Sequence, residues 1–458
     1  MSRQLLRLST ITLLIATVSY LIISKIIFDK IYATSNIIVD EEFHLPLGEA
    51  YCQYNFNKWD PKVTTLPGLY LLTSLIFGKW SLCSTYWLRF VSLITSTINV
   101  LLFYIFLKLN NKEVPWKNVI SAINLSILPP LYFFSHVYYT DVSSIMMTML
   151  VLISAKKEWH YFVSIFGALA IIMRQTNVIW IAMLFGDYIL KELYLLSFEK
   201  TRYLKQIRIP LESIQTLIRK IVTDPGHILK KTDFQFVLDC SSYLSVIFSF
   251  LLFVYLNGSI VVGDKTAHEA TIHVPQLFYF ATFTLIFAWP HFISCIPQFL
   301  KFVWKNKFLF VVLIISSLCI VHYNTLVHPY MLADNRHYVF YVWNRFYGRY
   351  NFFRYIMVII YIFAIYAITS KIWNKYDISF ALMLIVCTII VLVMQKLIEI
   401  RYYLFPFILF RLQFKKTHTM ILLLENLTYM SINAITLYIF FNKTIMWDTY
   451  DYPQRLIW

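Results

Sequence analysis

Two adjacent carboxylates, Asp40 and Glu41, follow the first long apolar stretch of the chain. A carboxylate just past a membrane span is well placed to act as a general base, and packing carboxylates together raises the pKa of at least one of them. A solvated loop entrance is the alternative interpretation. Nearby residues favour the general base, because Trp59 and Tyr70 offer ring faces for a sugar and Asp60 offers an acceptor for a hydroxyl.

A second polar group, Arg174-Gln175-Thr176-Asn177, lies between two apolar stretches. An arginine at the end of a membrane span is costly unless it has an anionic partner. One possible partner is a carboxylate in another loop, such as Asp141. The other is a lipid phosphate or a sugar, and the sequence leaves both pairings open.

A third polar group places a cation, an imidazole and two sugar-binding groups on four consecutive residues, Asp334-Asn335-Arg336-His337. A phosphate leaving group is best matched by the planar, permanently charged guanidinium of an arginine. Another loop adds polar side chains of the same kind: Asp264, Lys265 and His268.

Two common kinds of site are missing from the sequence. A zinc site is disfavoured because there is no His-Glu-x-x-His or Cys-x-x-Cys motif and the histidines lack close ligand spacing. The Asp-x-Asp pair that holds a metal-bound nucleotide sugar is also missing. A transferase built on these residues therefore needs a donor other than a nucleotide sugar, and we expect no metal or other cofactor.

The elements that position these residues must lie in a membrane. Of the 458 residues, 59% are apolar and 14% are charged, whereas about 25% of the residues of a soluble domain are charged. The apolar residues, about 270 in number, limit the chain to about thirteen transmembrane helices of roughly 20 residues. This composition excludes a soluble enzyme, a disordered chain and a coiled coil, and it predicts an all-α polytopic membrane protein.

Apolar runs bounded by charge or proline predict the spans 9–29, 84–107, 118–134, 141–155, 160–172, 177–190, 237–257, 276–298, 308–327, 352–370, 378–394, 400–412 and 418–441. With the amino terminus in the cytoplasm, most Lys and Arg residues fall on the cytoplasmic side, in agreement with the positive-inside rule. The basic stretch 191–236 is then a cytoplasmic loop near anionic membrane lipid. The net charge of +16 therefore reflects topology, and no nucleic-acid partner is expected.

The opposite face holds the acidic clusters and several histidines, and its first loop is 30–83. We place the chemistry there. A transporter is the alternative from another class, but transporters usually hold their charged residues at the bilayer midplane on broken helices. Here the polar motifs cluster in loops and at span ends. Cys52 and Cys83 fall on this face and could pair, which the sequence leaves open.

Taken together, several motifs in one order give the chain a resemblance to a known family. The motifs are Asp40-Glu41-x-Phe43-His44, Trp59-Asp60-Pro61-x-x-Thr64-Thr65-x-Pro67-Gly68-Leu69-Tyr70, Tyr138-Tyr139-Thr140-Asp141, Arg174-Gln175-Thr176-Asn177, Gly263-Asp264-Lys265-x-x-His268, His328-Pro329-x-x-x-Ala333-Asp334-Asn335-Arg336-His337-Tyr338, Glu399-x-Arg401-Tyr402 and Arg455-x-x-Trp458. The chain resembles, nearly end to end, the endoplasmic-reticulum family of dolichyl-phosphate-glucose α-1,2-glucosyltransferases. That family adds the third, terminal glucose to the lipid-linked oligosaccharide. Glu42 and Leu47-Gly48-Glu49 depart from the family pattern, which bears on acceptor contacts.

The resemblance implies a single integral membrane domain over residues 1–458, with the C-type glycosyltransferase (GT-C) fold of about 12–14 transmembrane helices. It implies a luminal active site in the endoplasmic-reticulum membrane and no metal. The donor would be dolichyl phosphate β-glucose, and the acceptor the diglucosylated high-mannose dolichyl diphosphate oligosaccharide. Because a β donor gives an α product, one in-line displacement with a single base is expected. Another dolichyl-phosphate-sugar-dependent transferase is the alternative within this class.

The resemblance also suggests roles for individual residues. Asp40 would deprotonate the acceptor 2-hydroxyl, and Glu41 would support or replace it. The departing dolichyl phosphate would be stabilised by Arg336, His337, Lys265 and Arg174. Sugar and acceptor would be bound by His44, Trp59, Asp60, Tyr70, Asp141, Gln175, Asn177, Asp264, His268, Asp334 and Asn335.

Overall fold

The computed structural model describes residues 3–110, 114–198, 207–265, 270–373, 377–415 and 417–458. Within these residues six helices are long and apolar enough to cross a membrane: α1 (Arg3–Thr34), α4 (Thr85–Asn110), α12 (Phe234–Asn257), α16 (Lys307–Asn324), α19 (Phe353–Ile372) and α22 (Thr419–Asn442). A small antiparallel sheet pairs β1 (Thr444–Ile445) with β2 (Gln454–Arg455). The chain is therefore an all-α polytopic membrane protein, as predicted.

The other predicted spans also coincide with helices, two of them in pieces. Five are single helices: α7 (Thr140–Lys156), α8 (His160–Met173), α9 (Asn177–Phe198), α20 (Ser379–Val393) and α21 (Arg401–Leu412). The span 118–134 is divided into α5 (Pro115–Ser126) and α6 (Pro129–Phe134). The span 276–298 is divided into α13 (Pro275–Phe287), α14 (Trp289–Phe292) and α15 (Cys295–Lys305). Proline disfavours helical geometry in the residue before it, which explains the break at the extended Leu128.

The two long segments predicted as loops contain helices of their own. Within 30–83 lie the end of α1, α2 (Glu41–Cys52), α3 (Gly68–Phe77) and the short η1 (Gly78–Trp80). A disulfide bond between Cys52 and Cys83 joins the end of α2 to the segment that precedes α4. Within 191–236 lie the end of α9, α10 (Leu211–Thr223) and α11 (Pro225–Lys230). Three short elements follow α16: α17 (Pro329–Ala333), α18 (Tyr338–Val342) and η3 (Trp343–Tyr347).

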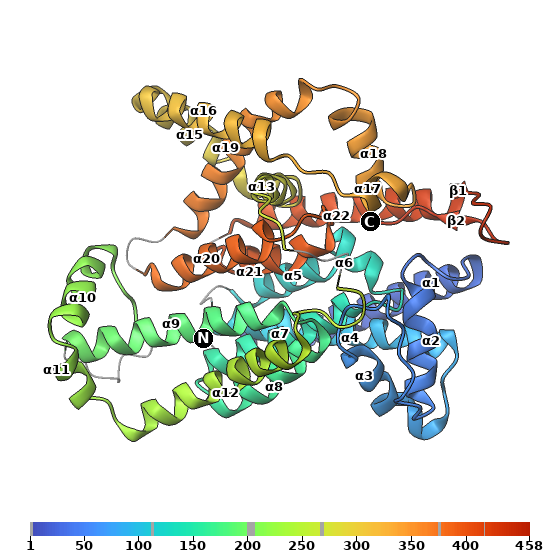
Figure 1. The fold of residues 1–458 in the computed structure, drawn as a ribbon, viewed down its shortest axis with the longest axis horizontal. Helices are drawn as coiled ribbons and strands as arrows, with labels where there is room; N and C mark the ends of the chain where they lie inside the picture. Colours follow the sequence, from blue (N-terminus) through green and yellow to red (C-terminus); the bar gives the residue numbers. More distant parts are fainter. Residues whose placement is uncertain (1–2, 111–113, 199–206, 266–269, 374–376, 416) are drawn as a thin grey trace.

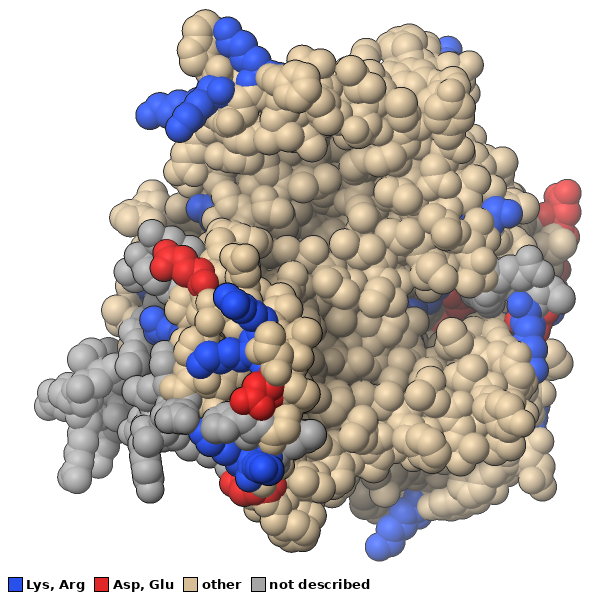
Figure 2. Space-filling view, turned by 60° about the vertical axis from the view of Figure 1, so that its left-hand side comes forward, with Lys and Arg blue, Asp and Glu red and all other residues tan. Residues whose placement is uncertain are grey.

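The two segments lie at opposite ends of the molecule. Figure 1 shows α10 and α11 at one end of the long axis, and α2, α3 and the β1–β2 pair at the other. On the face drawn in Figure 2, charged side chains gather toward the edges, and a broad surface between them carries few charges. A surface of this kind is expected of a protein that meets lipid between two aqueous ends.

The ends of α7, α8, α9 and α21 position the polar residues at the end of the molecule where α2 lies. α7 packs against α4 and α8, and its side chains are buried almost throughout. Asp141 lies in the first turn of α7, the Arg174–Asn177 tetrad joins α8 to α9, and Arg401 begins α21. Residues that are distant in sequence are brought to one place by the packing of these helices.

Candidate active site

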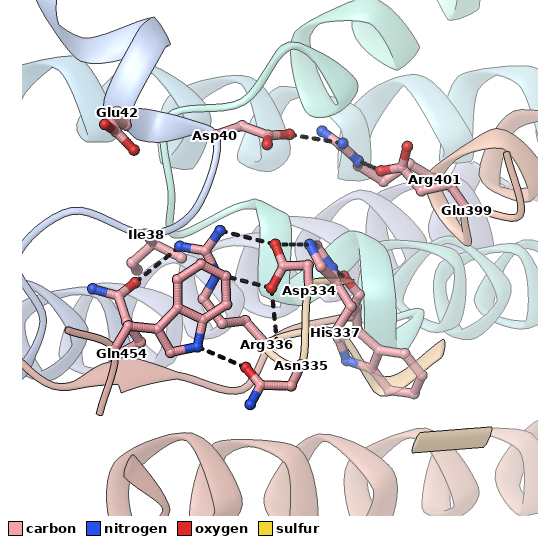
Figure 3. A network of polar contacts seen from close by, with 12 residues as sticks. Ile38, Asp40, Glu42, Asp334, Asn335, Arg336, His337, Glu399, Arg401 and Gln454 are labelled. Carbon is pink, nitrogen blue, oxygen red and sulfur yellow. Dashed lines mark hydrogen bonds and ion pairs between the residues drawn. The ribbon is translucent and has the colours of Figure 1, made fainter. Parts of the chain in front are cut away.

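Arg401 connects the carboxylates of three separate segments. Its Nη2 donates to Oδ2 of Asp40 at 2.8 Å, its Nη1 lies 3.9 Å from Oδ2 of Asp141, and its Nε donates to Glu399. Asp40 is the residue before α2, and its side chain makes no cap to that helix. The carboxylate turns instead toward Arg401, as Figure 3 shows.

The backbone around Asp40 holds this orientation. Its amide N–H donates to the Tyr139 hydroxyl at 3.0 Å, and that hydroxyl donates to the Ile38 carbonyl at 3.2 Å. Val39 has a φ of 46°, a left-handed conformation that is strained for a β-branched residue. Such strain persists only where surrounding contacts impose it, and it is most common at functional sites.

Asp40 is suited to be an ionised base that substrate can reach. Its side chain keeps 34% of its exposure, against 14% for that of Arg401. Burial raises the pKa of the Asp40 carboxyl, but the charge of Arg401, with smaller effects from His44 and His337, outweighs it, so that the pKa lies below its usual value. The carboxylate is therefore charged at neutral pH and can accept a proton. The raised pKa that clustered carboxylates predicted from the sequence is not found at Asp40, because Arg401 pairs with it.

Asp141 and Arg174, for which the sequence left two pairings open, form an ion pair of 2.5 Å. Among the residues that the structure describes, none forms a hydrogen bond with the Oδ2 atom of Asp141. The structure therefore shows the carboxylate pairing, and a phosphate or sugar contact of Arg174 stays a prediction. Beside this pair is a pocket lined by polar residues, which include Asp141, Arg174, Arg401, Gln395 and Asn177, and by apolar residues, which include Ile145, Trp180, Val391, Leu404 and Phe405.

The other two tetrad residues that were predicted to bind sugar, Gln175 and Asn177, form hydrogen bonds to other segments of the chain. Gln175 donates from Nε2 to the carbonyl of Thr64 at 2.8 Å. Asn177 donates from Nδ2 to Ser144 Oγ and to the Ala170 carbonyl at 2.8 and 2.7 Å. Gln175 therefore ties the tetrad to the segment before α3, and Asn177 ties α9 to α7 and α8.

Glu41 occupies a different environment from its neighbour Asp40. Its side chain is fully buried, and its two oxygens accept from Nε and Nη2 of Arg89 at 2.9 and 2.6 Å. They also accept from the backbone amides of Tyr138 and Ile38 at 2.7 and 3.0 Å. With four hydrogen bonds, this carboxylate has no open oxygen for a substrate, and it joins α2 to α4 and to the start of α7.

His44, Tyr70 and Trp59 form an aromatic group on α2, α3 and the intervening segment. His44 Nδ1 lies 2.6 Å from the Tyr70 hydroxyl, and the Trp59 ring stands edge-on to Tyr70 with centroids 6.3 Å apart. Burial lowers the pKa of His44 to about 4, so the imidazole is neutral at neutral pH. Asp60 follows Trp59 and accepts from the Lys62 amide at 2.9 Å.

The Asp334–His337 run lies beside the Asp40–Arg401 pair (Figure 3). Arg336 donates through Nε and Nη2 to the two oxygens of Asp334 at 2.9 and 2.8 Å. His337 Nε2 is 3.6 Å from Asp334, and Asn335 accepts from the Trp447 indole at 2.8 Å. Burial raises the pKa of the Asp334 carboxyl, but hydrogen bonds from Arg336 and the charge of His337 leave it below its usual value.

The loop that contains Asp264 and Lys265 docks on the first predicted loop. The Asp264 amide donates to the Pro61 carbonyl at 2.7 Å. The Lys265 ammonium donates to the Asn257 carbonyl at 2.5 Å, close to the end of α12. The structure does not place Lys265 in the Asp40–Arg401 group, and His268 lies outside the described residues.

Comparison with known proteins explains this combination of residues. The family model described as "DIE2/ALG10 family" matches residues 34–412, which include Asp40, Asp141, Arg174, Arg336 and Arg401. The chain belongs to the DIE2/ALG10 family.

Similar proteins of the DIE2/ALG10 family come from animals and plants. A Drosophila melanogaster protein is 39% identical over 97% of this chain and 99% of its own length. A human protein is 37% identical over 92% of this chain and 93% of its own, and one from Arabidopsis thaliana is 29% identical over 92% and 94%. All three are named Dol-P-Glc:Glc(2)Man(9)GlcNAc(2)-PP-Dol alpha-1,2-glucosyltransferase. No solved structure matches the chain.

Three residues of this DIE2/ALG10 site were not singled out as candidates from the sequence. Arg401 and Glu399 stand in a motif of the resemblance, but nothing local indicates that they meet Asp40. Arg89 lies within a predicted apolar span. Because an arginine there is costly without an anionic partner, its presence in the sequence could have predicted a buried carboxylate beside it.

Proposed function

We infer that the chain transfers glucose from dolichyl phosphate β-glucose, in α-1,2 linkage and with inversion, to the diglucosylated high-mannose dolichyl diphosphate oligosaccharide. It is a dolichyl-phosphate-glucose-dependent glucosyltransferase of the endoplasmic-reticulum membrane, and the reaction completes the lipid-linked oligosaccharide used for N-glycosylation. Membership of the DIE2/ALG10 family and the names of relatives at 37–39% identity support this reaction.

One observation carries the proposal at the level of chemistry. The pocket lined by Asp141, Arg174 and Arg401 is also lined by apolar side chains of α7, α9, α20 and α21. A substrate with a charged phosphate and a long hydrocarbon chain would contact both kinds of side chain. The carboxylate of Asp40 lies 2.8 Å from Arg401, one of the lining residues.

In the proposed reaction Asp40 is the general base. It takes the proton of the acceptor 2-hydroxyl while that oxygen forms a bond to C1 of the donor glucose. The bond between C1 and the phosphate oxygen breaks at the same time, and its electron pair leaves with dolichyl phosphate. A single displacement converts the β donor into an α product and forms no glycosyl-enzyme. Glu41, held by Arg89, keeps the helix that carries this base in place.

Cationic side chains are proposed to stabilise the departing phosphate. Arg174 lines the pocket, and Arg336 and His337 belong to the run drawn near Asp40 in Figure 3. Because arginine is charged at every relevant pH, this assignment requires no metal ion. In the described residues no group of three or more His, Cys, Asp or Glu side chains is placed to hold one. Trp59, Asp60 and Asp141 would hold sugar hydroxyls and ring faces.

We place this end of the molecule in the lumen. The basic segment with α10 and α11 lies at the opposite end (Figure 1), and basic loops remain on the cytoplasmic side of a membrane. The disulfide between Cys52 and Cys83, beside the site, also suits an oxidising compartment. The acceptor oligosaccharide would then approach from the aqueous side of α2 and α3.

The decisive test is a transfer assay on purified protein with labelled dolichyl phosphate glucose and the diglucosylated acceptor. We expect incorporation of one α-1,2-linked glucose. Asp40→Asn should abolish transfer and leave the protein folded, whereas Glu212→Gln, an exposed carboxylate on α10 at the opposite end of the molecule, should leave transfer unchanged. Near-normal turnover by Asp40→Asn would exclude Asp40 as the base, and transfer of another sugar from its dolichyl phosphate in preference to glucose would overturn the substrate.

A further inference from the structure

The segment 443–458 follows α22 and returns to the Asp334–His337 run. The β1–β2 pair turns it back, with Thr444 opposite Arg455. Beyond β2 the backbone amide of Ile457 donates to the Arg336 carbonyl at 2.8 Å, and the Tyr338 amide donates to the Ile457 carbonyl at 3.1 Å. These two bonds enclose His337, so this segment adds a short parallel bridge to the loop that carries the two predicted phosphate ligands.

Side chains of the segment surround the guanidinium of Arg336. The Gln454 side-chain carbonyl, in a residue only 2% exposed, accepts from Arg336 Nη1 at 3.1 Å. The Trp447 ring lies against the same guanidinium, 4.3 Å from its centre, while its indole N–H donates to Asn335. The Trp458 carbonyl oxygen lies 3.1 Å from His337 Nδ1. Asn335, Arg336 and His337 are thus each contacted by a residue of this segment.

The segment is itself anchored to three helices. Arg455 donates to the carbonyls of Phe440 and Phe441 at the end of α22 and to that of Thr34 at the end of α1. The Tyr450 hydroxyl donates to Glu42 on α2 at 2.6 Å. The contacts therefore extend from the membrane helices to the loop beside Asp40.

The run 334–337 needs such support. It lies between α17 and α18, each of five residues, too short to fix a loop by their own packing. An arginine side chain loses considerable conformational entropy when it is held in one rotamer, and a site that is ordered before the substrate arrives avoids that cost during reaction. Asp334 and Gln454 use three of the five N–H donors of Arg336, and Tyr450 also lies beside this guanidinium.

We propose that two residues of the segment 443–458, Gln454 and Trp447, belong to the catalytic site as positioning residues that hold Arg336 toward the phosphate of a polyprenyl-type lipid donor. The inference rests on the proposed function only in taking that phosphate as the leaving group. It assigns a role to residues that lie beyond the matched family region 34–412. The competing explanation is that the segment merely stabilises the fold.

A double-mutant cycle separates the two explanations. Gln454→Leu and Trp447→Phe each remove one hydrogen-bonding group, and Met446→Ala, an exposed neighbour, is the matched control. We expect Gln454→Leu to lower kcat/KM for dolichyl phosphate glucose about tenfold, and Trp447→Phe about fivefold, in the otherwise native protein. In an Arg336→Lys background the same changes should cost less than about twofold, because partners that act together are not additive. Equal losses in both backgrounds would overturn the inference.

A binding measurement keeps this inference separate from the proposed function. Dolichyl phosphate should raise the unfolding temperature of the native protein and of Met446→Ala, and clearly less that of Gln454→Leu. If one variant does not fold, the other carries the test. Native protein that binds dolichyl phosphate in this pattern but transfers no glucose would contradict the function and support the positioning role. Identical shifts in all folded variants would contradict the positioning role alone.

Discussion

Asp40 and Arg401, which are 361 positions apart in the sequence, form an ion pair of 2.8 Å, and Arg401 also lines a pocket. Arg401 also contacts Glu399 and approaches Asp141, so that a single guanidinium orders carboxylates from three segments. Because one partner precedes α2 and the other begins α21, the pair exists only when the two halves of the chain are packed together.

Removing the charge of Arg401 should move the acid limb of the pH–activity profile. Arg401 lowers the pKa of Asp40, and a general base works only when ionised. In Arg401→Gln the pKa of Asp40 rises, so activity should be lost at a higher pH than in the native protein as pH falls. Arg401→Lys should restore part of the shift. A profile with an unchanged acid limb and a uniformly lower rate would show that Arg401 has no effect on the base.

Breaking the Glu41–Arg89 pair should destabilise the protein rather than alter its chemistry. Both side chains are buried, with 0% and 1% exposure, and removing one partner of such a pair typically costs about 3–5 kcal/mol. We expect Arg89→Met and Glu41→Gln to lower the unfolding temperature and the yield of folded protein. The exposed Glu49→Gln on the same helix should change neither. If Glu41→Gln folds normally but loses all turnover, Glu41 acts in the reaction itself.

The Cys52–Cys83 disulfide should stabilise the first loop of the site. It closes a loop with a sequence separation of 31, and a cross-link of this size contributes about 2–4 kcal/mol. Cys52→Ser and Cys83→Ser should therefore lower the unfolding temperature by similar amounts, and the double variant by no more than either alone. Additive losses would mean that the two thiols are not joined. Cys319, an exposed free thiol, provides the control substitution.

Cysteine labelling should show which end of the molecule faces the lumen. Met446 and Val222 are 70% and 73% exposed and belong to the site end and to α10, respectively. In sealed microsomes a membrane-impermeant maleimide should label Val222→Cys, and it should label Met446→Cys only after detergent is added. The opposite pattern would reverse the proposed orientation. The native protein controls for labelling of its own thiols.

The sequence by itself determined the class of protein and the positions of its helices. Hydropathy and proline are local signals, so each predicted span coincides with one or more helices, even where Pro129 divides one of them. The motif around Asp40 and the tetrad at Arg174 were also visible in the sequence, because scarce charges in an apolar chain are conspicuous, and the structure brings them to the same end of the molecule. The helices α2 and α3 lie within a segment that polar composition had suggested was a loop.

Only the tertiary structure decided which charges meet. Asp40 and Glu41 are adjacent in sequence, yet Asp40 is partly exposed and pairs with Arg401, whereas Glu41 is buried and pairs with Arg89. The same holds for Arg336, whose neighbours Gln454 and Trp447 come from the far end of the chain. The energy of an ion pair depends on distance and burial, and both are set by the packing of whole helices rather than by neighbouring residues. The partners of the two carboxylates were therefore outside the reach of the sequence.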